Sequence, residues 1–124
     1  MSILNKLFGA SSDEKELPTF WKRLNDENDL EEAIEKSKEN KVVIFKHSTR
    51  CIISKTVLKN FENEVKNSDK KVDFYFLDLL ANRGLSNKIA ERFDVTHQSP
   101  QILILENGVS VKDASHQAIS LDLV

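Results

Sequence analysis

The only cysteine of the chain, Cys51, stands where an apolar run gives way to a helical pattern. Residues 42–45 are Val-Val-Ile-Phe, the composition of a strand that is buried on both faces. After Cys51, apolar residues recur every four positions from Ile53 to Val65, which is helical spacing. Cys51 is therefore expected at the first turn of a helix, where unpaired backbone N–H groups and the helix dipole favour an anion. A thiolate is such an anion, and it is the reactive form of cysteine.

The polar side chains around Cys51 are suited to thiol chemistry. Arg50 is adjacent and would stabilise an anionic substrate group, with Thr49 as a supporting neighbour. His47, expected in the same loop, is a candidate general acid for a leaving thiolate, with a structural hydrogen bond as an equal alternative. Ser54 follows one helical turn later and could donate its hydroxyl to the thiolate, or be an ordinary serine of a first helical turn. A lone cysteine is most often a buried and inert residue, but this polar setting favours a reactive thiol.

Length and composition are those of one globular domain. The chain has 124 residues, with residues 20–124 expected to form the domain and residues 1–19 an N-terminal extension and linker. Its 18 basic and 20 acidic residues are interspersed, which argues against a nucleic-acid partner. One cysteine cannot form an internal disulfide, and no Cys/His cluster has the spacing of a zinc site, so no bound metal is expected.

The N-terminus carries apolar residues at Ile3, Leu4, Leu7 and Phe8, interrupted by polar ones. This run is too short for a secretory signal or a transmembrane helix. We therefore expect a cytoplasmic protein that does not associate with membranes.

The remaining patterns alternate between strand and helix. Strands are expected at residues 20–24, 42–45, 72–78, 101–106 and 109–112, and helices at 29–39, after Cys51 and at 86–93. The first of these helices would be capped by Asn28 or Asp29, and a turn is expected at residues 82–84. The pair Asn107-Gly108 predicts a hairpin, and Ser120 is expected to cap a short final turn. Early β-α-β units with an antiparallel hairpin predict an α/β fold, a mixed sheet with helices on both faces.

The second feature of chemical interest is His97-Gln98-Ser99-Pro100, directly before the strand at residues 101–106. By itself, a proline ahead of a buried strand indicates only how the chain enters that strand. Sequence spacing alone does not bring Ser99 and Pro100 next to Cys51.

The order of elements, the Cys-Ile-Ile-Ser segment from Cys51 and the Ser-Pro pair resemble the thioredoxin fold. In detail, His-Ser-Thr-Arg-Cys-Ile-Ile-Ser together with His-Gln-Ser-Pro-Gln resembles the monothiol bacilliredoxins, the YtxJ-like family of bacterial cytosolic proteins. The resemblance covers roughly residues 20–120. It implies a central mixed sheet flanked by helices, with a C-terminal helix that is short or absent here.

The resemblance also implies an activity: removal of bacillithiol, a low-molecular-weight thiol, from S-thiolated client proteins. Cys51 would be the attacking thiol, and Ser54 would stand where thioredoxins carry a second cysteine. Pro100 matches the cis-proline of the fold, and Ser99 the residue whose backbone pairs with substrate. No tightly bound cofactor is implied, bacillithiol or a similar thiol serves as co-substrate, and a monomer is expected.

Two departures from the relatives bear on this assignment. Ile52 follows the cysteine where relatives usually have proline, and Phe45 stands where thioredoxins bury an acid. Lacking that acid and a resolving cysteine, the chain should not run a dithiol cycle. The alternatives are an iron–sulfur or metal carrier like the monothiol glutaredoxins, which the bulky Ile52 and Ile53 argue against, and a non-catalytic thioredoxin-like adaptor with an unreactive Cys51.

Overall fold

A computed structural model describes residues 17–124. The prediction of an apolar N-terminal segment falls outside these residues, as does most of the predicted linker. The elements follow the predicted alternation of strands and helices: β1 (Trp21–Arg23), α3 (Glu27–Lys36), β2 (Lys41–His47), α4 (Ile52–Lys66), β3 (Val72–Asp78), α5 (Arg83–Phe93), β4 (Gln101–Glu106) and β5 (Val109–Ser115). Two short 3-10 turns, η2 (His116–Ala118) and η3 (Leu121–Leu123), follow β5 in place of a longer terminal helix.

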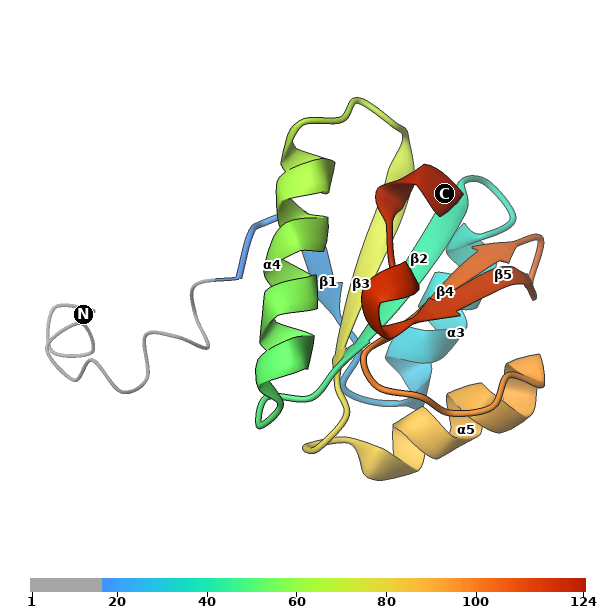
Figure 1. The fold of residues 1–124 in the computed structure, drawn as a ribbon. Helices are drawn as coiled ribbons and strands as arrows, with labels where there is room; N and C mark the ends of the chain where they lie inside the picture. Colours follow the sequence, from blue (N-terminus) through green and yellow to red (C-terminus); the bar gives the residue numbers. More distant parts are fainter. Residues whose placement is uncertain (1–16) are drawn as a thin grey trace, which may run out of the picture.

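The strands form one mixed sheet in the order β1-β3-β2-β4-β5 (Figure 1). β1 and β2 run parallel to β3, while β4 runs antiparallel to both β2 and β5. The start of β4 therefore lies at the same edge of the sheet as the end of β2. That edge is where the loop to α4 carries Cys51, so the topology joins the two features that the sequence keeps about fifty residues apart.

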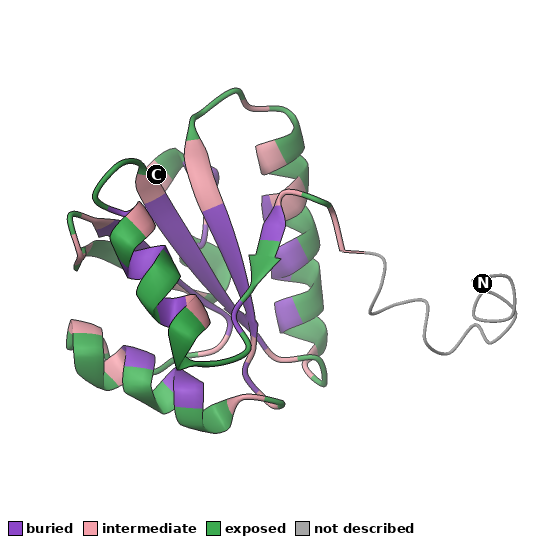
Figure 2. Ribbon diagram, turned by 180° about the vertical axis from the view of Figure 1, so that it is seen from behind, coloured by how far each residue is buried: buried purple, intermediate pink, exposed green. Residues whose placement is uncertain are grey.

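Helices cover both faces of the sheet, which confirms the predicted α/β fold. α4 and the C-terminal turns pack on one face, and α3 and α5 lie on the other (Figure 1). Seen from behind, the buried positions run down the central strands and along the inner sides of α3 and α5 (Figure 2). The β2 residues alternate between the two cores, with Val43 and Phe45 facing α4 and Val42 and Ile44 facing the opposite layer. Burying these side chains on both faces supplies the hydrophobic stabilisation that β2 needs as a central strand.

The core beneath α4 is aromatic. Trp21 stacks on Phe61 of α4 with ring centroids 6.2 Å apart and meets Phe45 edge-on at 5.9 Å. Its indole N–H donates to the Glu62 carboxylate at 2.7 Å, so the polar end of the ring is satisfied where it reaches the surface. These contacts join the short strand β1 to α4, and they fix the helix that begins immediately after Cys51.

Two predicted boundaries are wrong at the helix starts. α3 begins at Glu27 because Asp26, and not Asn28 or Asp29, is the capping residue: its carboxylate accepts the Asp29 N–H at 2.8 Å. The turn predicted at residues 82–84 belongs instead to the first turn of α5, which starts at Arg83. The Asn82 carbonyl accepts the Ser86 N–H at 3.0 Å, so the chain is already helical there.

The C-terminal part of the chain forms the two turns that its sequence predicts. Asn107 and Gly108 have φ of 53° and 83°, as the tight hairpin turn between β4 and β5 requires, and this confirms the prediction. β5 runs to Ser115, three residues beyond the predicted strand. Ser120 caps η3 by accepting the Asp122 N–H at 3.1 Å. Lys70, in the loop after α4, donates to the carbonyls of Leu121 and Val124 and ties this end of the chain down.

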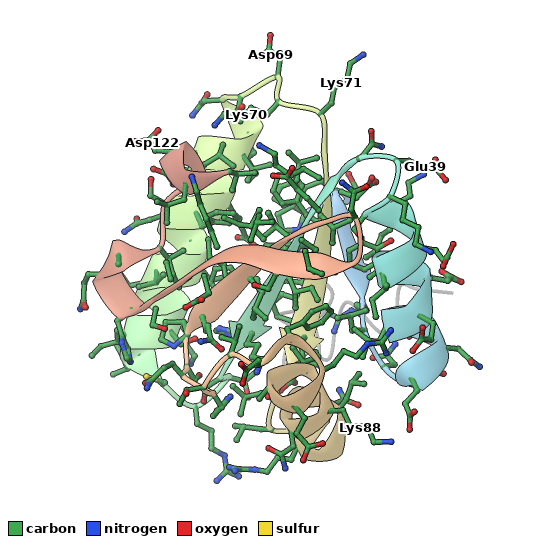
Figure 3. The ribbon with its side chains drawn as sticks, turned by 90° about the vertical axis from the view of Figure 1, so that its right-hand side faces the viewer. Glu39, Asp69, Lys70, Lys71, Lys88 and Asp122 are labelled. Atoms are coloured by element: carbon green, nitrogen blue, oxygen red, sulfur yellow. The ribbon has the colours of Figure 1, made fainter. Side chains whose placement is uncertain are left out.

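Charged side chains of both signs point outward from separate parts of the surface, among them Glu39, Asp69, Lys71, Lys88 and Asp122 (Figure 3). Lys88 of α5 forms an ion pair with Glu27 of α3, and Arg92 pairs with Glu31 at 3.0 Å, so the two helices are joined at the surface. Within the described residues, no helix is both long and apolar enough to cross a membrane.

Candidate active site

Cys51 is the residue that caps the start of α4. Its backbone is extended (φ −105°, ψ 121°), its N–H donates to the Ser48 carbonyl at 3.2 Å, and its own carbonyl accepts the Lys55 N–H at 3.0 Å. The side chain makes no capping hydrogen bond and is half-buried. The fold therefore uses the backbone of Cys51 to start the helix, and the cysteine side chain belongs to the helix end whose backbone N–H groups and dipole favour an anion.

His47 is not in the polar loop where the sequence placed it; it is the last residue of β2 and is buried. β2 is longer than predicted because its pairing with β3 continues through Lys46 and His47, up to Asp78. The His47 Nδ1 lies 2.8 Å from the Ser54 hydroxyl. The pKa of His47 is lowered to about 4, chiefly by burial; the Asp78 carboxylate opposes this shift, and the Lys55 charge adds a smaller lowering. At neutral pH this imidazole is uncharged, so the structure favours the structural hydrogen bond over the general acid, the two roles that the sequence left open for His47.

Ser54 is fully buried, and its hydroxyl is engaged on two sides. It contacts His47 Nδ1 and accepts the Ser48 N–H at 3.1 Å. Among residues 17–124, no hydrogen bond joins this hydroxyl to the Cys51 sulfur. Ser54 thus fastens the β2–α4 loop to the helix, and the loop in turn determines where Cys51 lies.

Thr49 and Arg50 are exposed residues of the turn that leads into Cys51. In the part of the chain that the structure describes, Arg50 forms no ion pair, and its guanidinium is open to solvent. The geometry leaves it available to an anionic group that approaches the thiol.

The Ser99-Pro100 bond is cis, as predicted. The last antiparallel pair of β2 and β4 is Lys46 with Gln101, so Pro100, one residue further out, lies level with His47. The Pro100 carbonyl accepts the His116 N–H at 3.0 Å, while no hydrogen bond within residues 17–124 uses the Ser99 N–H or carbonyl. The Ser99 hydroxyl is buried without a hydrogen-bond partner there. The loop before β4 thus reaches the edge of the sheet where Cys51 lies.

A buried lysine, which the sequence analysis missed, lies under this loop. Lys46 is completely buried, and its ammonium donates to the Ser86 carbonyl at 3.2 Å and lies 3.4 Å from His97 Nδ1. Burial lowers its pKa to about 8, since the charged form is poorly solvated there. Burial also lowers the pKa of His97, as do the positive charges of Lys46 and Arg83. The lysine therefore links β2 to α5 and to the loop that ends in Pro100.

Gln101, the strand partner of Lys46, holds the same loop from the other side. Its amide N–H donates to the Thr96 carbonyl at 3.0 Å, and its amide oxygen accepts the Gln98 N–H at 3.4 Å. Polar residues at the ends of two apolar strands were visible in the sequence. That Lys46 and Gln101 lie opposite each other depends on the register of β2 and β4, which the sequence did not show.

No group of three or more His, Cys, Asp or Glu side chains within residues 17–124 is arranged to hold a metal ion. The one cysteine of the chain, Cys51, lies at the same edge of the sheet as the Ser99-Pro100 loop. A family model described as monothiol bacilliredoxin BrxC matches residues 22–124.

The chain belongs to the monothiol bacilliredoxin family.

Solved structures agree with this assignment. A candidate oxidoreductase with a thioredoxin fold is 31% identical and superposes with a TM-score of 0.74, covering 84% of this chain and 89% of that one. Thioredoxin from Fasciola hepatica is 22% identical (TM-score 0.65; 82% and 91% covered), and mitochondrial thioredoxin 3 from Saccharomyces cerevisiae is 19% identical (TM-score 0.60; 79% and 85% covered). The thioredoxins show the fold alone. Together with the family match, these comparisons support a thiol redox role for this bacilliredoxin, which has one cysteine and is therefore monothiol.

Proposed function

We propose that this protein is a monothiol disulfide oxidoreductase that removes bacillithiol, or a similar low-molecular-weight thiol, from S-thiolated proteins. The observation that carries the proposal is the position of Cys51. Its sulfur makes no capping bond at the start of α4, and it lies at the sheet edge that also carries the Ser99-Pro100 loop. The proposal places the protein in the cytoplasm as a monomer without a tightly bound cofactor.

The substrate of the first step is the mixed disulfide between the client protein and the low-molecular-weight thiol. The Cys51 thiolate attacks the sulfur that belongs to the low-molecular-weight thiol. A new disulfide forms between that sulfur and Cys51, the bond to the client sulfur breaks, and the client thiolate leaves and takes a proton from solvent. The free N–H groups at the start of α4 favour Cys51 as a thiolate both before the attack and when it later leaves. Arg50 is proposed to attract an ionised group of the incoming substrate.

The second step needs a thiol from outside, because the chain has no other cysteine. A second low-molecular-weight thiolate attacks the same sulfur of the Cys51 adduct, which releases the Cys51 thiolate and forms a symmetrical disulfide. One thiol is oxidised for each client disulfide that is reduced, so electrons balance over the two steps.

Ser99 is proposed to pair its free backbone groups with the extended client chain, in the manner of an added strand. Its neighbours Lys46 and Gln101 would keep the loop in place for that pairing.

Intact-mass analysis tests this function. The reduced protein is mixed with a protein S-thiolated by bacillithiol, and we expect Cys51 to gain the mass of bacillithiol while the client loses it. Other low-molecular-weight disulfides, run in parallel, identify the preferred thiol. If Cys51 gains no adduct from any of them, or if the purified protein carries an iron–sulfur chromophore, the proposal is wrong.

A further inference from the structure

Two isoleucines immediately after Cys51 are exposed to solvent. Ile52 is 78% exposed and Ile53 is 50% exposed, although Ile53 begins the apolar helical spacing of the sequence. Single exposed apolar residues are common on protein surfaces. Here the two residues occupy the first positions of α4, directly after Cys51, and the fold buries neither side chain.

The two isoleucines border a groove of about 260 Å³ between α4 and the turn η2. Val57 and Ile119, which are 8% and 9% exposed, also line it and belong to the core below. The other lining residues are uncharged as well: Thr56, Asn60 and Gln117. η2 lies beside the lower half of α4, the half that begins at Cys51 (Figure 1).

The groove begins next to the site of the reaction. Successive Cα atoms are about 3.8 Å apart, so the Cα atoms of Ile52 and Ile53 lie within about 8 Å of that of Cys51. Under the proposed function, two kinds of molecule come this close to the sulfur: the low-molecular-weight thiol and the client protein. Bacillithiol is small, polar and ionised, so an uncharged groove with an apolar floor suits it poorly. A polypeptide supplies the apolar side chains that such a groove buries favourably.

We propose that the groove between α4 and η2 receives an apolar side chain of the S-thiolated client, from a residue next to the modified cysteine. The inference rests on the proposed function and adds a specificity determinant to it. With the client seated there, the Cys51 thiolate reaches the low-molecular-weight sulfur, and the client sulfur lies beyond it as the leaving group. Which of the two sulfurs is attacked is a controlling factor in disulfide exchange, and the groove would decide it by orientation.

The test compares three bacillithiol mixed disulfides. The first is a short peptide with leucine on either side of its cysteine, the second has serine at those positions, and the third is free cysteine. We expect the wild-type protein to prefer the leucine peptide over the serine peptide. In the double variant Ile52→Thr/Ile53→Thr, the ratio of kcat/KM for the leucine peptide to kcat/KM for free cysteine should fall about tenfold, since two apolar contacts are lost.

Val111→Thr is the matched control, because Val111 is an exposed β-branched residue (46%) on β5, outside the groove. Its ratio should stay within about twofold of wild type. Equal wild-type rates for the leucine and serine peptides, or a uniform loss on all three substrates in the double variant, would overturn the groove while leaving the proposed function intact. A dimer seen by analytical ultracentrifugation that the double variant abolishes would assign the groove to a second copy and also overturn it. No reaction of the wild type with any of the three, or with the same peptides carrying the other low-molecular-weight thiols, would instead remove the proposed function itself.

Discussion

The Nδ1 of His47 lies 2.8 Å from the hydroxyl of Ser54, and this contact joins the end of β2 to the first turn of α4. Both residues are buried, and the same hydroxyl accepts the Ser48 N–H. The resemblance to thioredoxins places Ser54 where dithiol relatives carry a second cysteine. In this protein it joins the loop before Cys51 to the helix, and under the proposed function the lack of a second cysteine leaves regeneration of the thiol to an external reductant.

Replacing Cys51 with serine should abolish de-thiolation without unfolding the protein. The Cys51 side chain makes no capping bond and is half-buried, so the change in free energy of unfolding should stay within about 0.5 kcal/mol. Activity on an S-thiolated protein and a urea titration measure the two effects. De-thiolation that persists in Cys51→Ser would contradict the mechanism, because the chain has no second thiol.

Replacing Ser54 with alanine should destabilise the protein by about 1–3 kcal/mol, because the variant leaves the partly buried Ser48 N–H and the buried His47 imidazole without their partner. Ser68→Ala is the control: its hydroxyl also accepts a backbone N–H, that of Lys70, but at an exposed site. Urea denaturation of both variants gives the comparison. Equal, small losses would mean that the His47–Ser54 contact contributes little.

Acid should weaken the fold through His47. Its pKa is about 4 in the folded protein against 6.5 for the unperturbed side chain, so the unfolded state binds the proton more readily. The free energy of unfolding should therefore fall as the pH drops from 6.5 towards 4. His47→Asn removes the titrating group but keeps an amide near the Ser54 hydroxyl, and it should lose less stability over this range. The measurement is the urea midpoint between pH 7 and 5, with the exposed His116→Asn as control. A wild-type slope retained in His47→Asn would refute the assignment.

Alkaline pH should stabilise the fold through Lys46. Its pKa is about 8 in the folded protein against 10.5 unperturbed, so between these values the unfolded state again holds more protons. Stability contributed at this site should rise as the pH increases from 8 towards 10.5. Lys46→Met fills the site without a charge. Its free energy of unfolding should therefore not show this rise when denaturation curves are compared between pH 7 and 10. Lys59→Met, at an exposed position, is the control and should keep the rise of stability with pH.

Lys46→Met also tests the loop that the lysine contacts. If the contact with His97 positions the Ser99-Pro100 loop, the variant should raise KM for an S-thiolated protein several-fold with a smaller effect on kcat. Lys46→Arg, which keeps the charge, should recover part of the loss. An unchanged KM in Lys46→Met would show that the contact is not needed for substrate binding.

Local sequence determined most of the elements. The apolar spacing of α3 and α5, the strand at Val72–Asp78 and the Asn107-Gly108 turn depend on neighbouring residues, and they formed where the sequence predicted them or within a few residues. The position of Cys51 at a helix start was also a local inference. It held because a buried strand, a polar turn and a helical spacing follow each other within about twenty residues.

The tertiary structure decided the environment of the thiol. Whether His47 ended the strand or began the loop depended on its pairing with β3, and that pairing buried it against Ser54. The antiparallel pairing of Lys46 with Gln101 brought the Ser99-Pro100 loop to the edge that carries Cys51. These strand pairings join residues that are 31 positions apart, as His47 and Asp78 are, or 55 positions apart, as Lys46 and Gln101 are. The side-chain pattern of one strand does not specify which other strand it meets or in what register. The exposure of Ile53 has the same origin, since the sequence gives its spacing and only the packing of α4 decides which side of the helix is covered.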